Sequence, residues 1–225
     1  MTTASVSNGA SKRKAWLHRY GETLRYALHV IVRPFDGFWD LSREKRGSLA
    51  AANTIILLTL ITRILKLQYT SFQFITVHWA YVNIFSECLS ILLPLVIWCV
   101  ANWCWTTLFD GKGTFRDVYM GMGYSITPYV LLQLPMILLS NVLTLKEGSF
   151  WSVLNVLSLL WCGMLFIVAM MQIHDFTLGK TLLFTLMSLF GMLVVVFLLL
   201  LFFSLLSDAA GYFVSLYREI MFRLN

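Results

Sequence analysis

The chain has 225 residues, of which 59% are hydrophobic and only 12% charged, and its mean hydropathy is +0.76. Soluble domains carry about 25% charged residues, so the composition excludes an ordinary soluble protein and indicates a small integral membrane protein. The net charge of +6 does not predict a nucleic-acid partner, because nine of the seventeen Lys and Arg residues precede Leu49. Basic side chains next to a membrane are attracted to anionic lipid by about 1 kcal/mol each.

The first 48 residues form a basic N-terminal region. Residues 1–13 are small and polar, which favours disorder. Residues 14–32 predict an amphipathic helix that lies in the bilayer interface or packs against a partner protein, with one apolar face of Trp16, Tyr20, Leu24, Ala27, Leu28 and Ile31. Arg33-Pro34 ends this helix, since a residue before proline avoids the helical conformation. Asp36-Gly37 then predicts a turn, beside aromatic residues suited to the interface.

Five apolar segments are long enough to cross a bilayer. We expect them at residues 49–67, 84–109, 118–143, 151–173 and 181–206, and a second amphipathic helix in the tail, residues 207–225. Arg63 and Lys66 lie near the end of the first span and are expected to reach the interface with their charged ends. Glu87 lies at a similar depth in the second span, so it is a predicted partner of Arg63.

The third span contains residues that weaken helices, namely Gly121, Gly123, Pro128 and Pro135. In lipid, a broken backbone needs new partners from neighbouring helices or hydroxyl side chains, and Ser125 and Thr127 are adjacent to the break. This segment is therefore predicted inside the bundle. The two prolines are seven residues apart, nearly two helical turns, which predicts two kinks toward the same side.

The basic N-terminus sets the predicted orientation. The excess of Lys and Arg in cytoplasmic segments places residues 1–48, 110–117 and 174–180 in the cytoplasm. Five spans then place the C-terminus outside or in a lumen.

The sequence shows no recognisable catalytic motif. None of the four histidines has metal-binding spacing, and neither a G-x-S-x-G elbow nor a G-x-x-x-x-G-K-[ST] loop is present. The four cysteines lie in apolar segments, where small buried side chains are the expected explanation. Four acids, Asp36, Asp40, Asp110 and Asp117, could in principle gather around a metal or substrate on the cytoplasmic side. We nevertheless predict no enzyme activity, cofactor or metal.

The third span resembles a known family. Its G-Y-S-I-T-P-Y-V-L-L segment, with Gly123, Tyr124 and Pro128, is similar to the G-Y-x-x-x-P segment of the Yip family of Ypt-interacting membrane proteins. The preceding N-W and L-F-D-G-K-G-T-F segments and the five-span layout resemble bacterial members. In eukaryotes the resemblance implies small Rab-type GTPases and vesicle traffic. The R-P-F-D-G-F-W-D-L stretch at residues 33–41 departs from the family's D-L-Y-G-P motif in order and content.

The expected fold is therefore an all-α polytopic membrane helix bundle with five spans and amphipathic interfacial helices near both termini. The predicted function is a non-enzymatic Yip-type adaptor or organiser that binds a protein partner or anionic lipid through its cytoplasmic face. The partner would be a small GTPase in a eukaryote, and a plasma-membrane transporter subunit is an alternative in a bacterium. In that alternative the chain is an accessory subunit of a transport complex or a small permease acting as a homo-oligomer, with Asn102, Gln133 and Asn141 lining a path. The candidate structural or partner-binding residues are Asp36, Trp39, Asp40, Asn102, Asp110, Gly111, Gly123, Tyr124, Pro128 and Asn141.

Overall fold

The structure is a computed structural model that describes residues 20–74, 82–109 and 111–224. Every regular element in these residues is a helix. Five helical units are long and apolar enough to span a membrane: Leu49–Tyr69, Ile84–Leu108, Phe115–Ser140, Leu145–His174 and Leu178–Arg223. The predicted all-α polytopic fold is thus confirmed. Residues 14–19 of the predicted first helix and the loop residues 75–81 lie outside the described part.

The first described element is a helix over residues 20–32, and α2 (Pro34–Arg43) follows it. We call residues 20–48 the N-terminal lobe. The predicted turn at Asp36-Gly37 is wrong, because both residues lie in the first turn of α2. Pro34 stands at the start of that helix, where its missing N–H costs nothing. The corner is tight, since a Cβ on Gly37 would lie 3.0 Å from Cα of Val30.

The apolar face predicted for the bilayer is used differently in the structure. Ala27 and Val30 are buried in the main core, and Leu24 and Ile31 pack against it. The helix over residues 20–32 therefore covers the bundle with this face, which the prediction had placed in lipid. Leu28, from the same predicted face, is exposed. Burial within the protein takes precedence because a closely fitting surface lies next to this face: Val30 meets Gly37 of α2, and both Ala27 and Val30 belong to one core cluster with Phe38 and Leu41.

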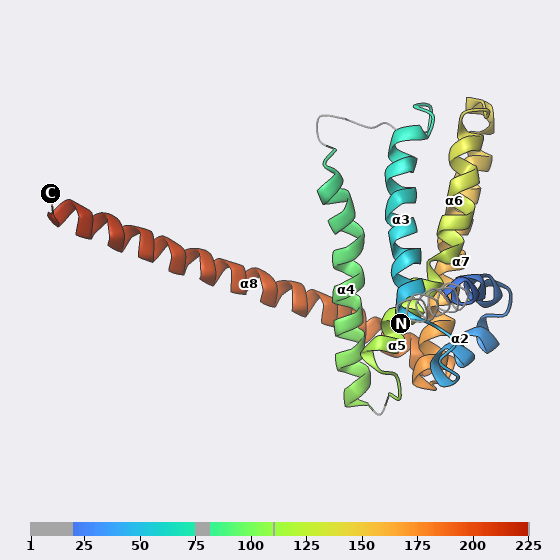
Figure 1. The fold of residues 1–225 in the computed structure, drawn as a ribbon, viewed down its shortest axis with the longest axis horizontal. Coiled ribbons are helices and arrows are strands. Elements are labelled where there is room, and N and C mark those ends of the chain that lie inside the picture. The colour runs from blue at the N-terminus through green and yellow to red at the C-terminus, as the bar shows by residue number, and fades with distance from the viewer. Residues whose placement is uncertain (1–19, 75–81, 110, 225) are drawn as a thin grey trace, which may run out of the picture.

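Helices α3 (Leu49–Tyr69) and α4 (Ile84–Leu108) run along the bundle in the same general direction as the labelled helices α6 and α7 (Figure 1). Each begins with a polar cap: Ser48 accepts a hydrogen bond from the N–H of Ala51, and Asn83 accepts one from the N–H of Phe85. Helix α3 packs on α6, and α4 packs on α8.

The third span consists of two helices, α5 (Phe115–Ser125) and α6 (Thr127–Ser140). It begins earlier than predicted because Thr114 and Asp117 form a capping box at its start. The chain breaks at Ile126, and Pro128 follows in the first turn of α6. Helix α6 continues through Pro135 to Ser140, so the chain does not break again there, and the second kink stays a prediction.

The last two spans are α7 (Gly148–His174), which follows the short 3-10 helix η2 (Leu145–Glu147), and α8 (Leu178–Leu224). The sequence predicted a separate tail helix, but α8 is continuous through it. No proline occurs after residue 135, so nothing in the sequence forces the helix to stop. Helix α8 starts against α4 and then runs across the bundle direction, away from the other helices (Figure 1).

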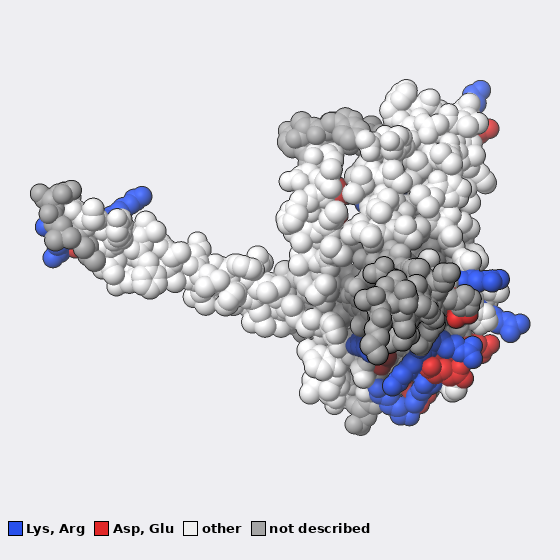
Figure 2. All heavy atoms as spheres, in the orientation of Figure 1, with Lys and Arg blue, Asp and Glu red and all other residues white. Residues whose placement is uncertain are grey.

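Charged side chains are concentrated at one end of the bundle. Figure 2 shows Lys and Arg interspersed with Asp and Glu over the end that carries the N-terminal lobe, whereas the flank of the bundle above is almost free of charge. This distribution matches a bundle with an uncharged belt in lipid and a charged end in water.

Candidate functional site

The tyrosine of the G-Y-S-I-T-P segment connects the N-terminal lobe to the bundle. Tyr124 is fully buried, with 0% of its surface exposed. Its hydroxyl donates to the backbone carbonyl of Thr23 (3.1 Å) and accepts from the backbone N–H of Ser48 (3.4 Å). Ser48 also donates from its hydroxyl to that of Thr23 (3.3 Å) while capping α3. One side chain from α5 thus holds both ends of the lobe.

The break after Tyr124 has its polar groups satisfied as the sequence suggested. Thr127 donates from its hydroxyl to the carbonyl of Tyr124 (2.7 Å), and Ser125 donates to the carbonyl of Met122 (2.8 Å). Pro128 is buried at the start of α6. Gly123 permits close packing, because a Cβ there would lie 2.9 Å from Cβ of Ala52 on α3. Gly123, Tyr124 and Pro128 therefore shape the third span from inside the protein.

The candidates on α2 lie at the surface. Asp36 is exposed in the first turn, and Trp39 is 48% exposed. Asp40 is half-buried and forms an ion pair with Arg46 at 3.4 Å. On the inner side, Tyr26 donates from its hydroxyl to the carbonyl of Gly37 (2.8 Å). Burial raises the pKa of Tyr26, and the nearby Asp40 carboxylate raises it further, so this phenol stays a donor and holds the corner together.

The loop after α4 packs against the end of α7. Gly111 and Gly113 lie beside His174: a Cβ on Gly113 would be 2.8 Å from Nδ1 of His174 and 2.5 Å from Cγ2 of Ile173. Asp110 lies outside the described residues. Only glycine fits at Gly113 without movement of its neighbours, so Gly113 serves close packing here.

An ion-pair bridge links this loop to the lobe. Lys112 donates from Nζ to Oδ2 of Asp175 (2.6 Å), and Arg43 of α2 donates to the same oxygen (3.3 Å). Asp175 adopts a left-handed conformation (φ 60°) that ends α7. The hydrogen bond from Lys112, with the positive charges of Lys112 and Arg43, lowers the pKa of the Asp175 carboxyl. Three segments far apart in the sequence therefore meet at one exposed surface.

Asn102 joins helices at the same end of the bundle. Its Nδ2 donates to the hydroxyl of Ser188 on α8 (3.1 Å), and its Oδ1 lies 3.1 Å from Nε2 of His174 on α7. Because Oδ1 is an acceptor, Nε2 of His174 carries the proton in this arrangement. Asn102 is buried, so it holds α4, α7 and α8 together.

Asn141 is at the opposite end of α6 from the α5–α6 break. Its Nδ2 donates to the backbone carbonyls of Tyr69 and Ile137, both at 3.0 Å. It thus fastens the end of α6 to the end of α3, and it does not come near Asn102. The polar residues suggested for a transport path serve separate helix contacts.

A polar cluster inside the bundle was missed by sequence reasoning. Lys66 is only 7% exposed, and it donates from Nζ to Oδ1 of Asn155 (2.9 Å) while lying 5.5 Å from the Trp151 ring centre. Gln133 donates to the same Asn155 oxygen (2.7 Å) and to the hydroxyl of Ser158 (2.9 Å). The expectation that Lys66 extends to the interface is therefore wrong, because α7 offers it both an acceptor and an aromatic face.

The neighbouring cation behaves as predicted. Arg63 donates from Nε to Oε2 of Glu87 at 3.0 Å, which joins α3 to α4. The signal for the Lys66 cluster was present in the sequence, since Asn155 and Ser158 are three residues apart on one face of α7. Nothing in a single sequence says which polar residue of another span this face meets.

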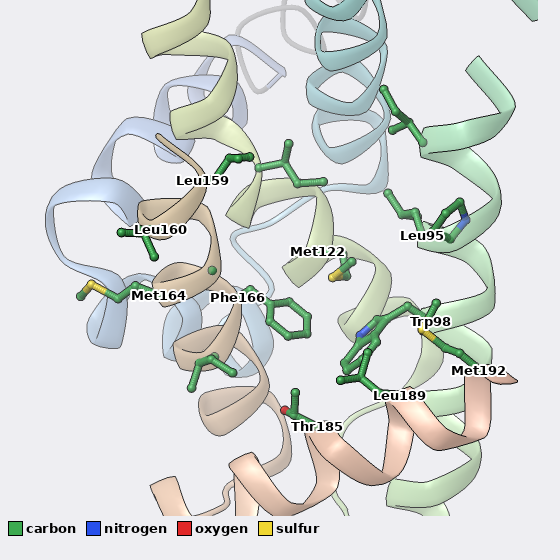
Figure 3. A pocket seen from close by; sticks show the side chains of 15 residues that line it. Leu95, Trp98, Met122, Leu159, Leu160, Met164, Phe166, Thr185, Leu189 and Met192 are labelled. Atoms are coloured by element: carbon green, nitrogen blue, oxygen red, sulfur yellow. The ribbon is translucent and has the colours of Figure 1, made fainter. Parts of the chain in front are cut away.

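A groove of about 770 Å³ opens between α4, the α5–α6 junction, α7 and the first part of α8 (Figure 3). Of the fifteen lining residues, only Trp98 and Thr185 carry a side-chain nitrogen or oxygen. Gln133, Asn102 and Asn141 are not among them, so this groove provides an apolar surface and no polar path.

Two of the four acidic candidates have local roles. Asp117 accepts from the N–H and hydroxyl of Thr114 in the capping box, and Asp40 pairs with Arg46. Across the residues that the structure describes, no group of three or more His, Cys, Asp and Glu residues is arranged to hold a metal ion.

Comparison with known proteins adds the family. No curated protein and no solved structure matches the chain. The family model of the Yip1 domain matches residues 28–201, which begin in the N-terminal lobe and end in α8. The matched region is well over half of the chain, and it contains Tyr124 with its hydrogen bonds to the lobe, the broken third span and the glycine loop. The chain therefore belongs to the Yip1 domain family of multi-pass membrane proteins.

Proposed function

We propose that the chain is a non-enzymatic membrane adaptor or organiser that binds a protein partner through the N-terminal lobe. The observation that carries this proposal is the rigid attachment of an exposed, charged helix edge to the bundle. Asp36 and Arg43 are exposed on α2, and the helix that bears them is fixed at both sides. A preformed surface loses little conformational freedom on binding, which favours recognition.

Three sets of contacts hold this edge in place. Tyr124 holds the helix before α2 and the segment after it. Tyr26 and Gly37 fix the corner between the two lobe helices. Arg43 and Lys112 meet at Asp175, which adds the loop and the α7–α8 turn to the same surface. A partner that binds here would contact segments from three parts of the sequence.

The orientation proposed from the sequence places this surface in the cytoplasm. Nine of seventeen cationic residues precede α3, and cytoplasmic segments carry such an excess. In a bacterium the membrane would be the plasma membrane. The partner class expected from the family is a small GTPase if the protein is eukaryotic, and anionic lipid is the other candidate for this face.

The test is affinity purification of the intact protein in mild detergent, with quantitative mass spectrometry of the co-purified proteins. Asp36→Ala should reduce the partner at least fivefold, because it removes an exposed charge without touching the core. Asp208→Ala is the matched control, since it removes an exposed carboxylate on α8. Equal partner recovery from the Asp36→Ala variant and the unsubstituted chain would exclude this edge as the binding surface.

A second candidate function is an accessory subunit of a transport complex, or a small permease that works as a homo-oligomer. The observation in its favour is the apolar groove, together with the distal part of α8, whose side chains are exposed. Gly163 lines the groove, and a Cβ added to it would meet no other atom within 4 Å. Gly163→Leu therefore places a larger side chain at the groove lining, starting from a Cβ that has open space around it.

This candidate predicts that Gly163→Leu removes a multi-pass partner or a second copy from the purified complex. Gly211→Leu is the control, because Gly211 also has open space around it but lies in the distal part of α8. Retention of all membrane partners in Gly163→Leu would argue against docking in this groove.

A further inference from the structure

The helix over residues 20–32 has three distinct sides. Ala27 and Val30 face the core. Leu28 (49% exposed) and Val32 (78% exposed) are four residues apart and form an exposed apolar edge. Arg25 and His29, also four apart and exposed, form the remaining side. The apolar edge is additional to the face predicted from the sequence, which is already used for packing.

Helix α2 repeats the same division. Phe38 and Leu41 are fully buried against the bundle. Phe35 (51% exposed) and Trp39 (48% exposed) are four apart and form an exposed apolar edge. The remaining side is charged, with the exposed Asp36 and Arg43 and the half-buried Asp40 on it. Two successive helices thus each have a packed face, an exposed apolar edge and a charged side.

This division is typical of a helix that lies partly in a bilayer interface. Such helices bury an apolar side about 5–10 Å into the boundary between headgroups and acyl chains, and Trp is favoured at that depth. The short connection between α2 and α3 keeps the lobe close to the membrane surface. Only residues 44–48 separate Arg43 from Leu49, where the first span begins, so the end of α2 stays within roughly 20 Å of the membrane.

The charges around the lobe favour an anionic leaflet. Arg25, Arg33 and Lys45 have no ion pair within the part of the chain that the structure describes. The preceding nineteen residues contain Lys12, Arg13, Lys14 and Arg19 and no acidic residue. Basic residues close to the surface are attracted to acidic headgroups, and the attraction falls off within a Debye length.

We propose that the apolar edges Leu28–Val32 and Phe35–Trp39 insert into the anionic lipid leaflet from which α3 begins. The charged side of α2, with Asp36 and Arg43, then remains free for a protein. This inference deepens the proposed function, since it divides the surface of the same lobe between lipid and partner. It assigns Trp39 to lipid.

The test uses the full chain in lipid nanodiscs with the four native cysteines replaced by Ala. A single cysteine at position 32 or 39 (Val32→Cys, Trp39→Cys) carries a polarity-sensitive fluorophore, and His29→Cys and Asp36→Cys on the charged sides are the controls. In discs of phosphatidylglycerol and phosphatidylcholine, nitroxide-labelled lipid should quench positions 32 and 39 at least twofold more than the controls. Equal quenching at all four positions by a water-soluble quencher would overturn the proposal.

The lipid charge is tested separately. Arg25→Gln with Arg33→Gln should reduce the lipid quenching at position 32 in anionic discs toward its value in discs of phosphatidylcholine alone. If quenching is the same in both kinds of disc before the substitution, the leaflet need not be anionic and that part of the proposal fails. Should the cysteine-free chain not fold, the same labels are placed on the native background after the exposed cysteine, Cys104, is replaced.

Two variants distinguish failure of the lipid proposal from failure of the proposed function, because one readout reports the partner and the other reports the lipid. Asp36→Ala should remove the co-purified partner and leave the lipid quenching at position 32 unchanged. Leu28→Asp, on the same apolar edge, should abolish the quenching at position 32 in discs and leave the partner bound in detergent. Loss of both readouts in either variant would show that lipid and partner do not use separate sides of the lobe.

Discussion

The hydroxyl of Tyr124 donates a hydrogen bond to the backbone carbonyl of Thr23, 101 positions earlier in the chain. The same hydroxyl accepts from the N–H of Ser48. These two contacts make the N-terminal lobe part of the membrane bundle, because its first helix and the start of α3 meet at one buried oxygen. The tyrosine of the family segment therefore has a positioning role.

Tyr124→Phe should loosen the lobe without unfolding the bundle. The substitution keeps the ring in its buried site and leaves the Thr23 carbonyl without its donor, which costs about 1 kcal/mol. For a chain of this size, the melting temperature should fall by roughly 2–4 °C. Amide exchange in residues 20–32 should rise more than in α4. Tyr212→Phe, at an exposed position, is the control. Unchanged amide exchange of residues 20–32 in Tyr124→Phe would show that the Tyr124 hydroxyl does not hold the lobe in place.

Gly113→Ala should destabilise the chain by about 1–3 kcal/mol through overpacking. The added methyl group would meet Ile173 and the buried ring of His174, and His174 cannot move without disturbing its contact with Asn102. Gly179→Ala adds the same atom with nothing within 4 Å and should leave the stability unchanged or improved. Thermal unfolding in detergent compares the two, and equal melting temperatures would show that the loop has room.

Lys66 and Asn155 should show strong energetic coupling. Asn155→Leu removes the acceptor of both Lys66 and Gln133, and a buried group left unpaired costs about 1–3 kcal/mol. Adding Lys66→Met removes the stranded ammonium, so the double variant should be more stable than the sum of the single effects predicts.

The measurement is a double-mutant cycle by thermal unfolding, with an expected coupling of about 0.5–3 kcal/mol. Asn53, which accepts from Tyr119 and not from Lys66, provides the control: Lys66→Met and Asn53→Leu should be additive. Additive effects for Lys66 and Asn155 would mean that their contact contributes little in the membrane.

The bridge at Asp175 should depend on pH in one direction. Lys112 is the main cause of the lowered pKa of this carboxyl, and Arg43 adds to it. A carboxyl whose pKa is lower in the folded state stabilises that state above its unfolded pKa, and the stabilisation is lost as pH falls through the folded pKa. The bridge should therefore be intact at pH 7 and weaken only below about pH 4.

Asp175→Asn should reproduce this loss at neutral pH. Amide exchange in residues 111–114 at pH 7 should be faster in the variant, and its thermal stability should change less than that of the unsubstituted chain between pH 5 and pH 3. High salt should have a similar effect, because exposed ion pairs are screened. A variant with the same pH dependence as the unsubstituted chain would show that the bridge contributes nothing measurable.

The sequence alone determined the number and type of the main elements. Five apolar runs of sufficient length predict five spans. In lipid, a single segment can pair all its backbone N–H and C=O groups internally only as a helix. The break in the third span was also predictable, since Gly123 and Pro128 weaken the helix and Ser125 and Thr127 can satisfy the freed carbonyls. The pairing of Arg63 with Glu87 followed from their similar depth.

Tertiary structure decided how these elements use their side chains. Lys66 turns inward because Asn155 and Trp151 happen to face it, and the apolar face of residues 20–32 covers protein because a matching surface lies next to it. Sequence periodicity shows that a face is apolar, but burial against lipid and burial against protein both remove it from water and leave the same pattern. Only the packing of neighbouring helices distinguishes the two.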